Sequence, residues 1–125
     1  MLALVGFSSS CKKDKEKDYE PISITVTGDF NEYVGWEAAI GLHNSKKNEV
    51  VAVGLPLAVK ATTTSLNFQM INGVGIDAFD KPGNYMVVFY FHKQGEKDAK
   101  YFIVSKAINE GPNSIEFSSF QLLLD

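Results

Sequence analysis

The chain contains one thiol, that of Cys11, and the residues around it limit what that thiol can do. An apolar segment, Met1–Phe7, comes first and is followed by serines at positions 8–10. An apolar core followed by small residues is typical of an export signal that is cut at its end. A lone cysteine excludes an internal disulfide, so an exported chain must use this thiol differently. We therefore expect a signal peptide at residues 1–10, with the cut at Cys11.

Residues 8–11, SSSC, together with the leader resemble the lipobox of bacterial lipoproteins. In that family the cysteine is lipidated on sulfur and becomes the mature N-terminus. The resemblance implies that Cys11 is lipidated and that the protein is exported and anchored in the outer membrane of a Gram-negative envelope. Two features depart from the family pattern. Ser8 stands where leucine is usual, and no basic residue precedes the apolar core, so we expect the natural start to lie upstream of Met1. The alternative is an ordinary thiol near the N-terminus.

A strongly charged segment follows the cysteine. Residues 12–20, KKDKEKDYE, hold four lysines and four acidic residues and have almost nothing to bury. Such a segment cannot offset the entropy lost on ordering. We expect residues 11–20 to form a flexible tether that spaces a folded domain, residues 21–125, away from a surface.

Catalytic chemistry has little support in the sequence. His43 and His92 each stand near the end of an apolar stretch, without a second histidine or cysteine at metal-ligand spacing. The serines of TTTS and FSSF lack the glycine-flanked elbow of serine hydrolases. Neither a phosphate-binding glycine loop nor a paired-cysteine motif is present. We predict no catalytic residue, no metal and no cofactor, and hence no enzyme.

Acidic residues gather in two loops and could supply oxygens to calcium. Asp29, Asn31 and Glu32 stand in the first loop, and Asp77 and Asp80 in the fourth. If consecutive strands alternate in direction, these loops lie at opposite ends of the fold. Each group alone falls short of the about six to eight oxygens that calcium binds. We therefore interpret both groups as turn-forming residues.

The first loop also carries aromatic rings. Phe30, Tyr33 and Trp36 flank a glycine there, and exposed rings could stack on sugars while the neighbouring polar groups bind hydroxyls. The alternative places Trp36 in the core, because it begins an alternating apolar run. The candidate ligand-binding residues are Asp29, Asn31, Glu32 and Tyr33.

The charge of the chain excludes one class of partner, and its hydropathy excludes one kind of membrane topology. The net charge is −3, and all 12 basic residues are lysines, so the guanidinium forks that recognise phosphate and guanine are absent. Nucleic acid is therefore excluded as a predicted partner. No stretch approaches the about 20 consecutive apolar residues of a membrane-spanning helix.

From Pro21 onward the hydrophobic pattern has a period of two, which is typical of strands with one buried face. ISITVT alternates Ile22, Ile24 and Val26 with polar residues, and TTTSLNFQMI repeats this pattern. In VVAVGLPLAVK we expect a bulge or an edge strand, because proline cannot donate to a ladder. YMVVFYFHK is apolar on both faces, as in a central strand of a packed sheet.

About seven such segments, separated by turn signals, fill about 105 residues. This pattern predicts an all-β fold, an immunoglobulin-like antiparallel β-sandwich, with a small β-barrel as the alternative. The immunoglobulin Cys-Trp-Cys signature is absent, so the expectation concerns architecture alone. Residues 74–120, which include GNYMVVFYF and FSSF, also resemble a module of small, poorly characterised bacterial lipoproteins, a resemblance that implies no catalytic residue.

Taken together, these features predict a lipid-anchored envelope protein that acts as a non-catalytic binding module. Its ligand is expected to be a carbohydrate. The alternative is an adhesion or assembly module that binds a protein partner through an exposed sheet edge.

The lipidation of Cys11 is directly testable. Expressed with a complete signal sequence, the protein should partition into the detergent phase and incorporate labelled palmitate, because several acyl chains, at about 0.8 kcal/mol per buried CH₂, hold a protein firmly at a membrane. The Cys11→Ser variant should be soluble. Identical fractionation of the two proteins, or a mature N-terminus other than Cys11, would refute the lipoprotein assignment.

Overall fold

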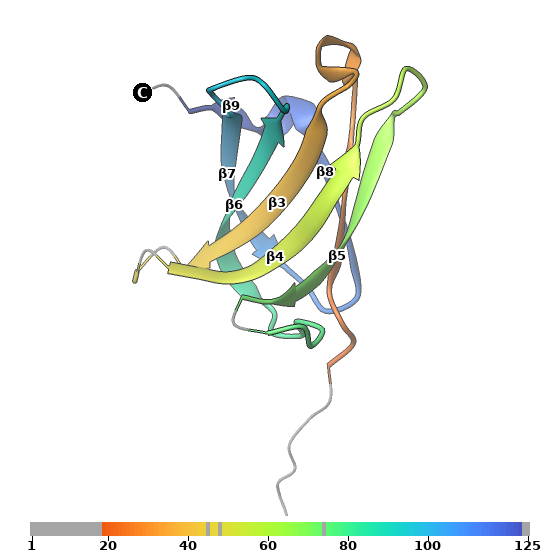
Figure 1. Ribbon diagram of the computed structural model, residues 1–125. Coiled ribbons are helices and arrows are strands. Elements are labelled where there is room, and N and C mark those ends of the chain that lie inside the picture. Colours follow the sequence, from red (N-terminus) through yellow and green to blue (C-terminus); the bar gives the residue numbers. More distant parts are fainter. Residues whose placement is uncertain (1–18, 45, 48, 74, 124–125) are drawn as a thin grey trace, which may run out of the picture.

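The computed structural model describes residues 19–44, 46–47, 49–73 and 75–123 (Figure 1). Cys11, the signal peptide expected at 1–10 and all but the last two residues of the expected tether lie outside the described residues. Within the described part of the chain, no helix is long and apolar enough to cross a membrane.

The described chain forms eight strands and two short 3-10 turns, with no α-helix. The strands are β2 (Ser23–Thr27), β3 (Glu37–Asn44), β4 (Glu49–Ala58), β5 (Ser65–Asn72), β6 (Gly83–His92), β7 (Lys100–Ile108), β8 (Pro112–Glu116) and β9 (Gln121–Leu122). The turns are η2 (Asn31–Tyr33) and η3 (Phe117–Ser119). The strands belong to one curled sheet in the order β8-β2-β5-β4-β3-β6-β7-β9, a half-barrel (Figure 1).

The all-β class is confirmed, but the structure differs from the predicted two-layered sandwich. All eight strands form one sheet, and this sheet is mixed because β2 and β8 run parallel. The closing apolar stretch, expected to be a single strand, is broken by η3 into β8 and β9. The alternative, a small barrel, is closer in shape, yet the strand order ends at β8 and β9, so hydrogen bonds leave the described sheet unclosed.

Irregularities in β4 and β5 curl the sheet. The register of β4 against β3 slips between Gly54 and Leu57, so of the two alternatives expected around Pro56, a bulge or an edge strand, the structure has the bulge; the register slips again beyond Ala52. Strand β5 pairs with β2 through residues 65–69 and with β4 through residues 70–72, so it turns the corner between the two parts of the sheet. Bulges bend strands and increase their twist. The curl therefore originates in these two strands.

One face of the curled sheet forms the core, as the period of two predicts. On β6, Val87, Phe89 and Phe91 are fully buried, whereas Met86 and Val88 on the other face are half-exposed. The same alternation buries the predicted apolar face of β2 and of β5. The buried residues on these two strands are Ile22 (just before β2), Ile24, Val26, Leu66, Phe68 and Met70.

Phenylalanine rings fill the open side of the half-barrel. The ring of Phe89 lies with its centroid 5.0 Å from that of Phe91 and 5.6 Å from that of Phe117. Phe120, after η3, lies 5.5 Å away. The C-terminal segment runs from β8, at one edge of the sheet, to β9, at the other, and its phenylalanines reach the core on the way. The packed phenylalanine rings therefore cover the side of the half-barrel where no strand-to-strand hydrogen bonds join the two edges of the sheet.

Phe89→Ala tests this account of the core. The change should lower the free energy of unfolding by about 3 to 5 kcal/mol, because it removes a fully buried ring and leaves a cavity. Chemical denaturation measures the loss. Val88→Ala, on the half-exposed face of the same strand, is the matched control and should cost less. A loss below about 1 kcal/mol for Phe89→Ala would show that this ring is not central.

Candidate functional site

The outer face of the central strands, opposite the core, is apolar and uncovered. Its residues form cross-strand rows: Gly41 pairs with Val88 and Val88 with Ile103, and in the next row Tyr90 pairs with Tyr101. β6 is a central strand, as its two apolar faces predicted, but no second layer covers this face within the described residues. Uncovered apolar faces of this kind often mark binding sites.

A groove of about 690 Å³ follows this face and is called the outer groove below. Residues of β3, β4, β6 and β7 line it, together with Leu123, and none of the lining residues is Asp, Glu or Lys. The principal ones are Gly41, Val53, Val88, Tyr90, Tyr101 and Ile103. Small-molecule sites have about 300 to 1,000 Å³ and are mostly apolar with a few polar groups, so the outer groove is of suitable size and character.

Two tyrosines form one wall of the outer groove. The ring centroids of Tyr90 and Tyr101 are 5.3 Å apart, with the rings inclined at 33°. Tyr101 is 42% exposed and Tyr90 is half-buried, so ring surface remains accessible to a ligand. A tyrosine offers an apolar ring and a polar hydroxyl together.

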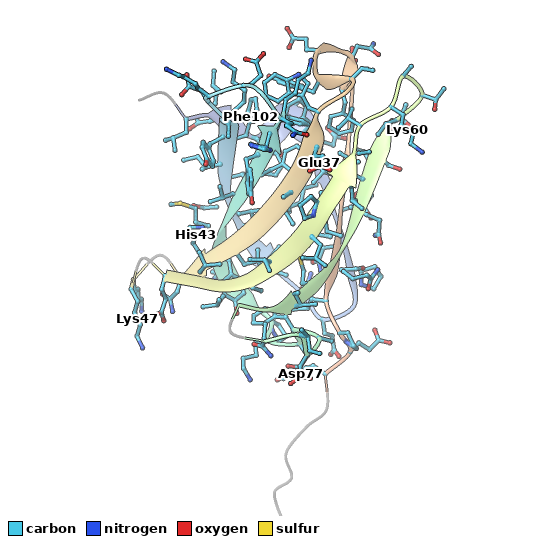
Figure 2. The ribbon with its side chains drawn as sticks, viewed as in Figure 1. Glu37, His43, Lys47, Lys60, Asp77 and Phe102 are labelled. Carbon is cyan, nitrogen blue, oxygen red and sulfur yellow. The ribbon has the colours of Figure 1, made fainter. Side chains whose placement is uncertain are left out.

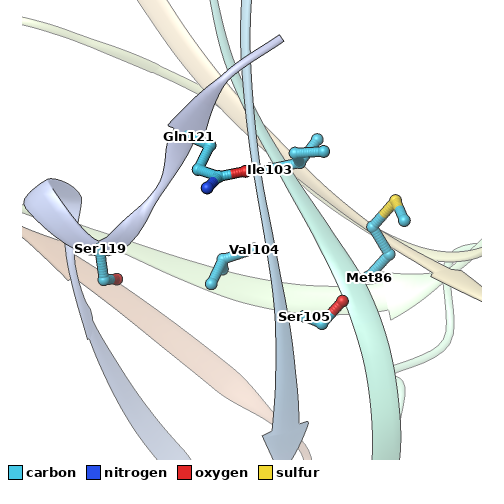
Figure 3. A pocket seen from close by; sticks show the side chains of 6 residues that line it. All are labelled: Met86, Ile103, Val104, Ser105, Ser119 and Gln121. Carbon is cyan, nitrogen blue, oxygen red and sulfur yellow. The ribbon is translucent and has the colours of Figure 1, made fainter.

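A smaller pocket of about 280 Å³, lined by three apolar and three polar residues, adjoins the outer groove and shares Met86 and Ile103 with it. Figure 3 shows Ser119 and Gln121, from the C-terminal segment, on one side of β7 and Met86 of β6 on the other. The Ser119 hydroxyl donates to the Glu116 carbonyl at 2.7 Å. The outer groove and this pocket together present aromatic rings beside hydroxyl and amide groups.

The predicted first-loop residues lie together, at η2, but outside the outer groove. Asp29, Asn31 and Glu32 are exposed, and the Asp29 carboxylate accepts a hydrogen bond from the Asn31 backbone N–H at 3.0 Å. This is the turn chemistry expected of the loop. Asp29 also borders a shallow hollow of about 340 Å³ together with Glu116.

Tyr33 lies at the first loop, and its ring also packs against the core. Its ring stacks on Phe91 with the centroids 3.9 Å apart and the rings parallel within 1°. Trp36 meets it edge-on at 5.7 Å and itself packs against the core. Burial, and next the charge of Glu32, raise the pKa of Tyr33. One face of the Tyr33 ring is therefore covered by the core.

The other polar candidates are dispersed. His43, half-exposed on β3, lines the outer groove, and His92 is exposed at the end of β6. Asp77 lies at the end of the sheet opposite the first loop, as strand alternation predicts (Figure 2). Among the residues that the structure describes, no three His, Cys, Asp or Glu side chains lie close enough to hold a metal.

The sequence reasoning missed the outer groove. Its signals were present: β6 is apolar on both faces, and a glycine interrupts the apolar run of β3 at position 41. These signals do not show whether a second layer covers the apolar face. The face is accessible because the described part of the chain has no such layer. Comparison with known proteins adds no relative, because no family model, curated protein or solved structure matches the chain.

The packing of Tyr33 predicts an alkaline loss of stability. Burial raises the pKa of both Tyr33 and Tyr85 above the ordinary value of 10.0, so the folded state favours the neutral phenol. This stabilisation is complete below pH 10.0 and is lost as the pH rises through the raised pKa values. The midpoint of denaturation should therefore fall above about pH 10, and by less in a Tyr33→Phe, Tyr85→Phe double variant. An equal fall in both proteins would contradict this.

Proposed function

We propose that this protein is a non-catalytic binding module, anchored through a lipid on Cys11 to the outer membrane of a Gram-negative bacterium, that holds a neutral glycan in the outer groove. The anchor rests on the resemblance of the leader and SSSC to a lipoprotein signal. The binding role rests on one observation, an uncharged, tyrosine-walled groove on an uncovered sheet face.

The chemistry of the outer groove supports a sugar. A pyranose ring has an apolar C–H face and a rim of hydroxyls. Tyr90 and Tyr101 offer ring surface to the first, and the adjoining Ser105 and Gln121 offer hydrogen-bonding groups to the second. A charged ligand would lose water at the groove without gaining a charged partner, which is costly. These features favour a neutral glycan.

The same lining supports binding without catalysis. The outer groove has no Asp, Glu, Lys or Cys among its lining residues, and its one imidazole, that of His43, has neither a carboxylate to orient it nor a serine or cysteine nucleophile beside it in that lining.

The placement of the groove suits an anchored protein. The described chain begins at the end of the sheet opposite the first loop, where the Glu20 amide donates to the Glu110 carboxylate at 2.9 Å (Figure 1). A membrane attached on that side leaves the outer groove open along the wall of the half-barrel. It also leaves the first loop at the far end.

The first loop is a second candidate surface for a glycan. Asp29, Asn31 and Glu32 expose polar groups within one turn, and Tyr33 presents the part of its ring that Phe91 leaves uncovered. The Tyr33 ring of the first loop is covered on one face by Phe91, whereas Tyr101 of the tyrosine pair is 42% exposed. We therefore favour the outer groove.

The edge of β7 supports the alternative function, in which a protein partner adds a strand. β9 pairs only with Phe102 and Ile103, so by the alternation of an antiparallel ladder the main-chain groups of Ser105 and Ala107 point to an open side. Lys106 lies between them, and lysine on an edge discourages pairing. The free edge is short, and we rank this alternative second.

A neutral glycan array separates the two surfaces. Tyr101→Ala should lose retention of the recognised glycan, because half of the tyrosine wall is removed, while its melting temperature stays close to that of the wild type. Asn31→Ala, at the first loop, should retain the glycan.

The opposite pattern would place the glycan on the first loop. If wild type retains no neutral glycan, the proposed ligand is wrong. The edge alternative then predicts that Ala107→Pro, which removes a free main-chain donor, abolishes capture of an envelope protein that wild type captures, and unchanged capture would exclude the edge too.

A further inference from the structure

The strands β7 and β8 are joined by only three residues, 109–111, yet they do not pair with each other. Strands with so short a connection usually form a hairpin. Here the Asn113 side chain takes the place of the first hairpin contact. It accepts a hydrogen bond from the Asn109 backbone N–H and donates one to the Asn109 carbonyl, both at 2.9 Å. Beyond this contact β8 pairs with β2 instead, which leaves the edge of β7 open.

The open part of this edge, residues 104–108, is called the free edge below. The Leu123 N–H donates to the Tyr101 carbonyl at 2.8 Å, so the odd-numbered residues of β7 turn their main-chain groups away from β6. β9 uses the groups at residues 101–103. The N–H and C=O groups of Ser105 and Ala107 have no partner within the described chain, and a hollow of about 240 Å³ lies along them. The free edge has room for one strand of about five residues.

Lys106 lies between these free groups and points to the concave side of the sheet. It pairs with Tyr85, which packs against the core, and Val104 and Ile108 flank it on the same face. The lysine is exposed, and among the described residues no carboxylate pairs with it. A strand added at the free edge would therefore bring one side chain directly opposite an unpaired ammonium group.

The register determines which side chain fits there. Because Ser105 and Ala107 would exchange hydrogen bonds with the added strand, the residue opposite Lys106 forms a non-hydrogen-bonded pair, with the Cα atoms about 4.5 Å apart. An apolar residue at that place would remove water from the ammonium group without replacing it, and a lysine would repel it. A carboxylate would pair with it. The residues two positions away on either side would lie opposite Val104 and Ile108, where apolar side chains fit.

We propose that the free edge binds an extended segment of another protein with the pattern apolar-x-acidic-x-apolar, which adds antiparallel to β7 with its carboxylate opposite Lys106. A lysine on an edge discourages pairing in general. At this edge it therefore restricts pairing to segments that bring a carboxylate to the matching position. The inference goes beyond the proposed function and does not rest on the glycan, because it concerns a different surface.

The same geometry disfavours a second copy of the chain as the occupant. If two free edges paired antiparallel, Ser105 of each would lie opposite Ala107 of the other, and the two Lys106 side chains would lie opposite each other, which is repulsive. A register shifted by two residues would reach Ile103 or Asn109. The main-chain groups of these residues are already used, by β9 and by the Asn113 side chain.

The test is an amide NMR titration of the folded protein with Ac-VTETV-NH₂, Ac-VTQTV-NH₂ and Ac-VTKTV-NH₂. These peptides differ only at the residue opposite Lys106, and their sequences are the same in both directions. Wild type should bind the glutamate peptide about fivefold or more tightly than the lysine peptide, with the glutamine peptide between them and with shifts at the Ser105 and Ala107 amides. The preference should shrink at high salt, because salt screens exposed charges.

A charge reversal and a matched control test the role of Lys106. Lys106→Glu should reverse the order, so that the lysine peptide binds most tightly. Lys60→Glu makes the same change of charge in an exposed turn beyond β4 and should leave the order of wild type unchanged. All three proteins should have similar melting temperatures, since both lysines are exposed.

Lys106→Thr separates selection of a partner from simple protection of an edge. If Lys106 selects the partner, this variant should bind the three peptides alike. If wild type itself binds them alike, or binds none of them, the lysine only protects the edge and the proposal is refuted. A wild-type dimer whose dissociation on dilution shifts the Ser105 and Ala107 amides would make a second copy the occupant, which also refutes it. None of these outcomes affects the glycan, whose retention is measured separately with Tyr101→Ala.

Discussion

The packing of phenylalanine rings around Phe89 is the interaction on which the rest of this fold depends. A curled sheet whose edges are not hydrogen-bonded to each other needs something else to exclude water from its concave side. Here the C-terminal segment crosses from β8 to β9 and brings Phe117 and Phe120 against Phe89. Buried aromatic side chains carry large apolar areas, and tilted or edge-on pairs add to that stabilisation. Without this closure, the buried faces of β2, β5 and β6 would have no common core.

The curl that creates the core also creates the candidate site. Bulges in β4, and the change of partner along β5, bend a single sheet around its own side chains. Gly54 permits the close approach of Ile40 and Phe68 on the inner side. No further layer is then needed to bury the core, so the opposite face of the central strands stays uncovered within the described part of the chain. Its apolar residues line a groove instead of a second interface.

The first loop and the outer groove therefore differ in how far their side chains are used by the fold. At the first loop, the Asn31 backbone N–H donates to the Asp29 carboxylate and Tyr33 stacks on Phe91, so part of the local chemistry serves the fold. In the outer groove, Tyr90 and Tyr101 contact each other across β6 and β7, yet 42% of Tyr101 stays exposed. The exposed part of this ring is available to a ligand. This difference underlies our preference for the groove as the glycan site.

The sequence by itself determined the all-β class and the buried faces of β2, β5 and β6, because the side-chain period acts within a few residues. At Pro56 it left a bulge and an edge strand as alternatives, and the register slip in the sheet decided for the bulge. The expectation for Cys11 rests on a local pattern too, the resemblance of residues 8–11 to a lipobox. Only the tertiary structure decided that the strands form one curled sheet rather than two layers, since that depends on which edges pair, and pairing joins residues as distant as Ile24 and Phe68 or Val26 and Ile115. The outer groove also depends on this pairing of strand edges. An apolar face has the same sequence pattern whether a second layer covers it or not, and only the curl, by burying the core without a second layer, left the tyrosine pair accessible.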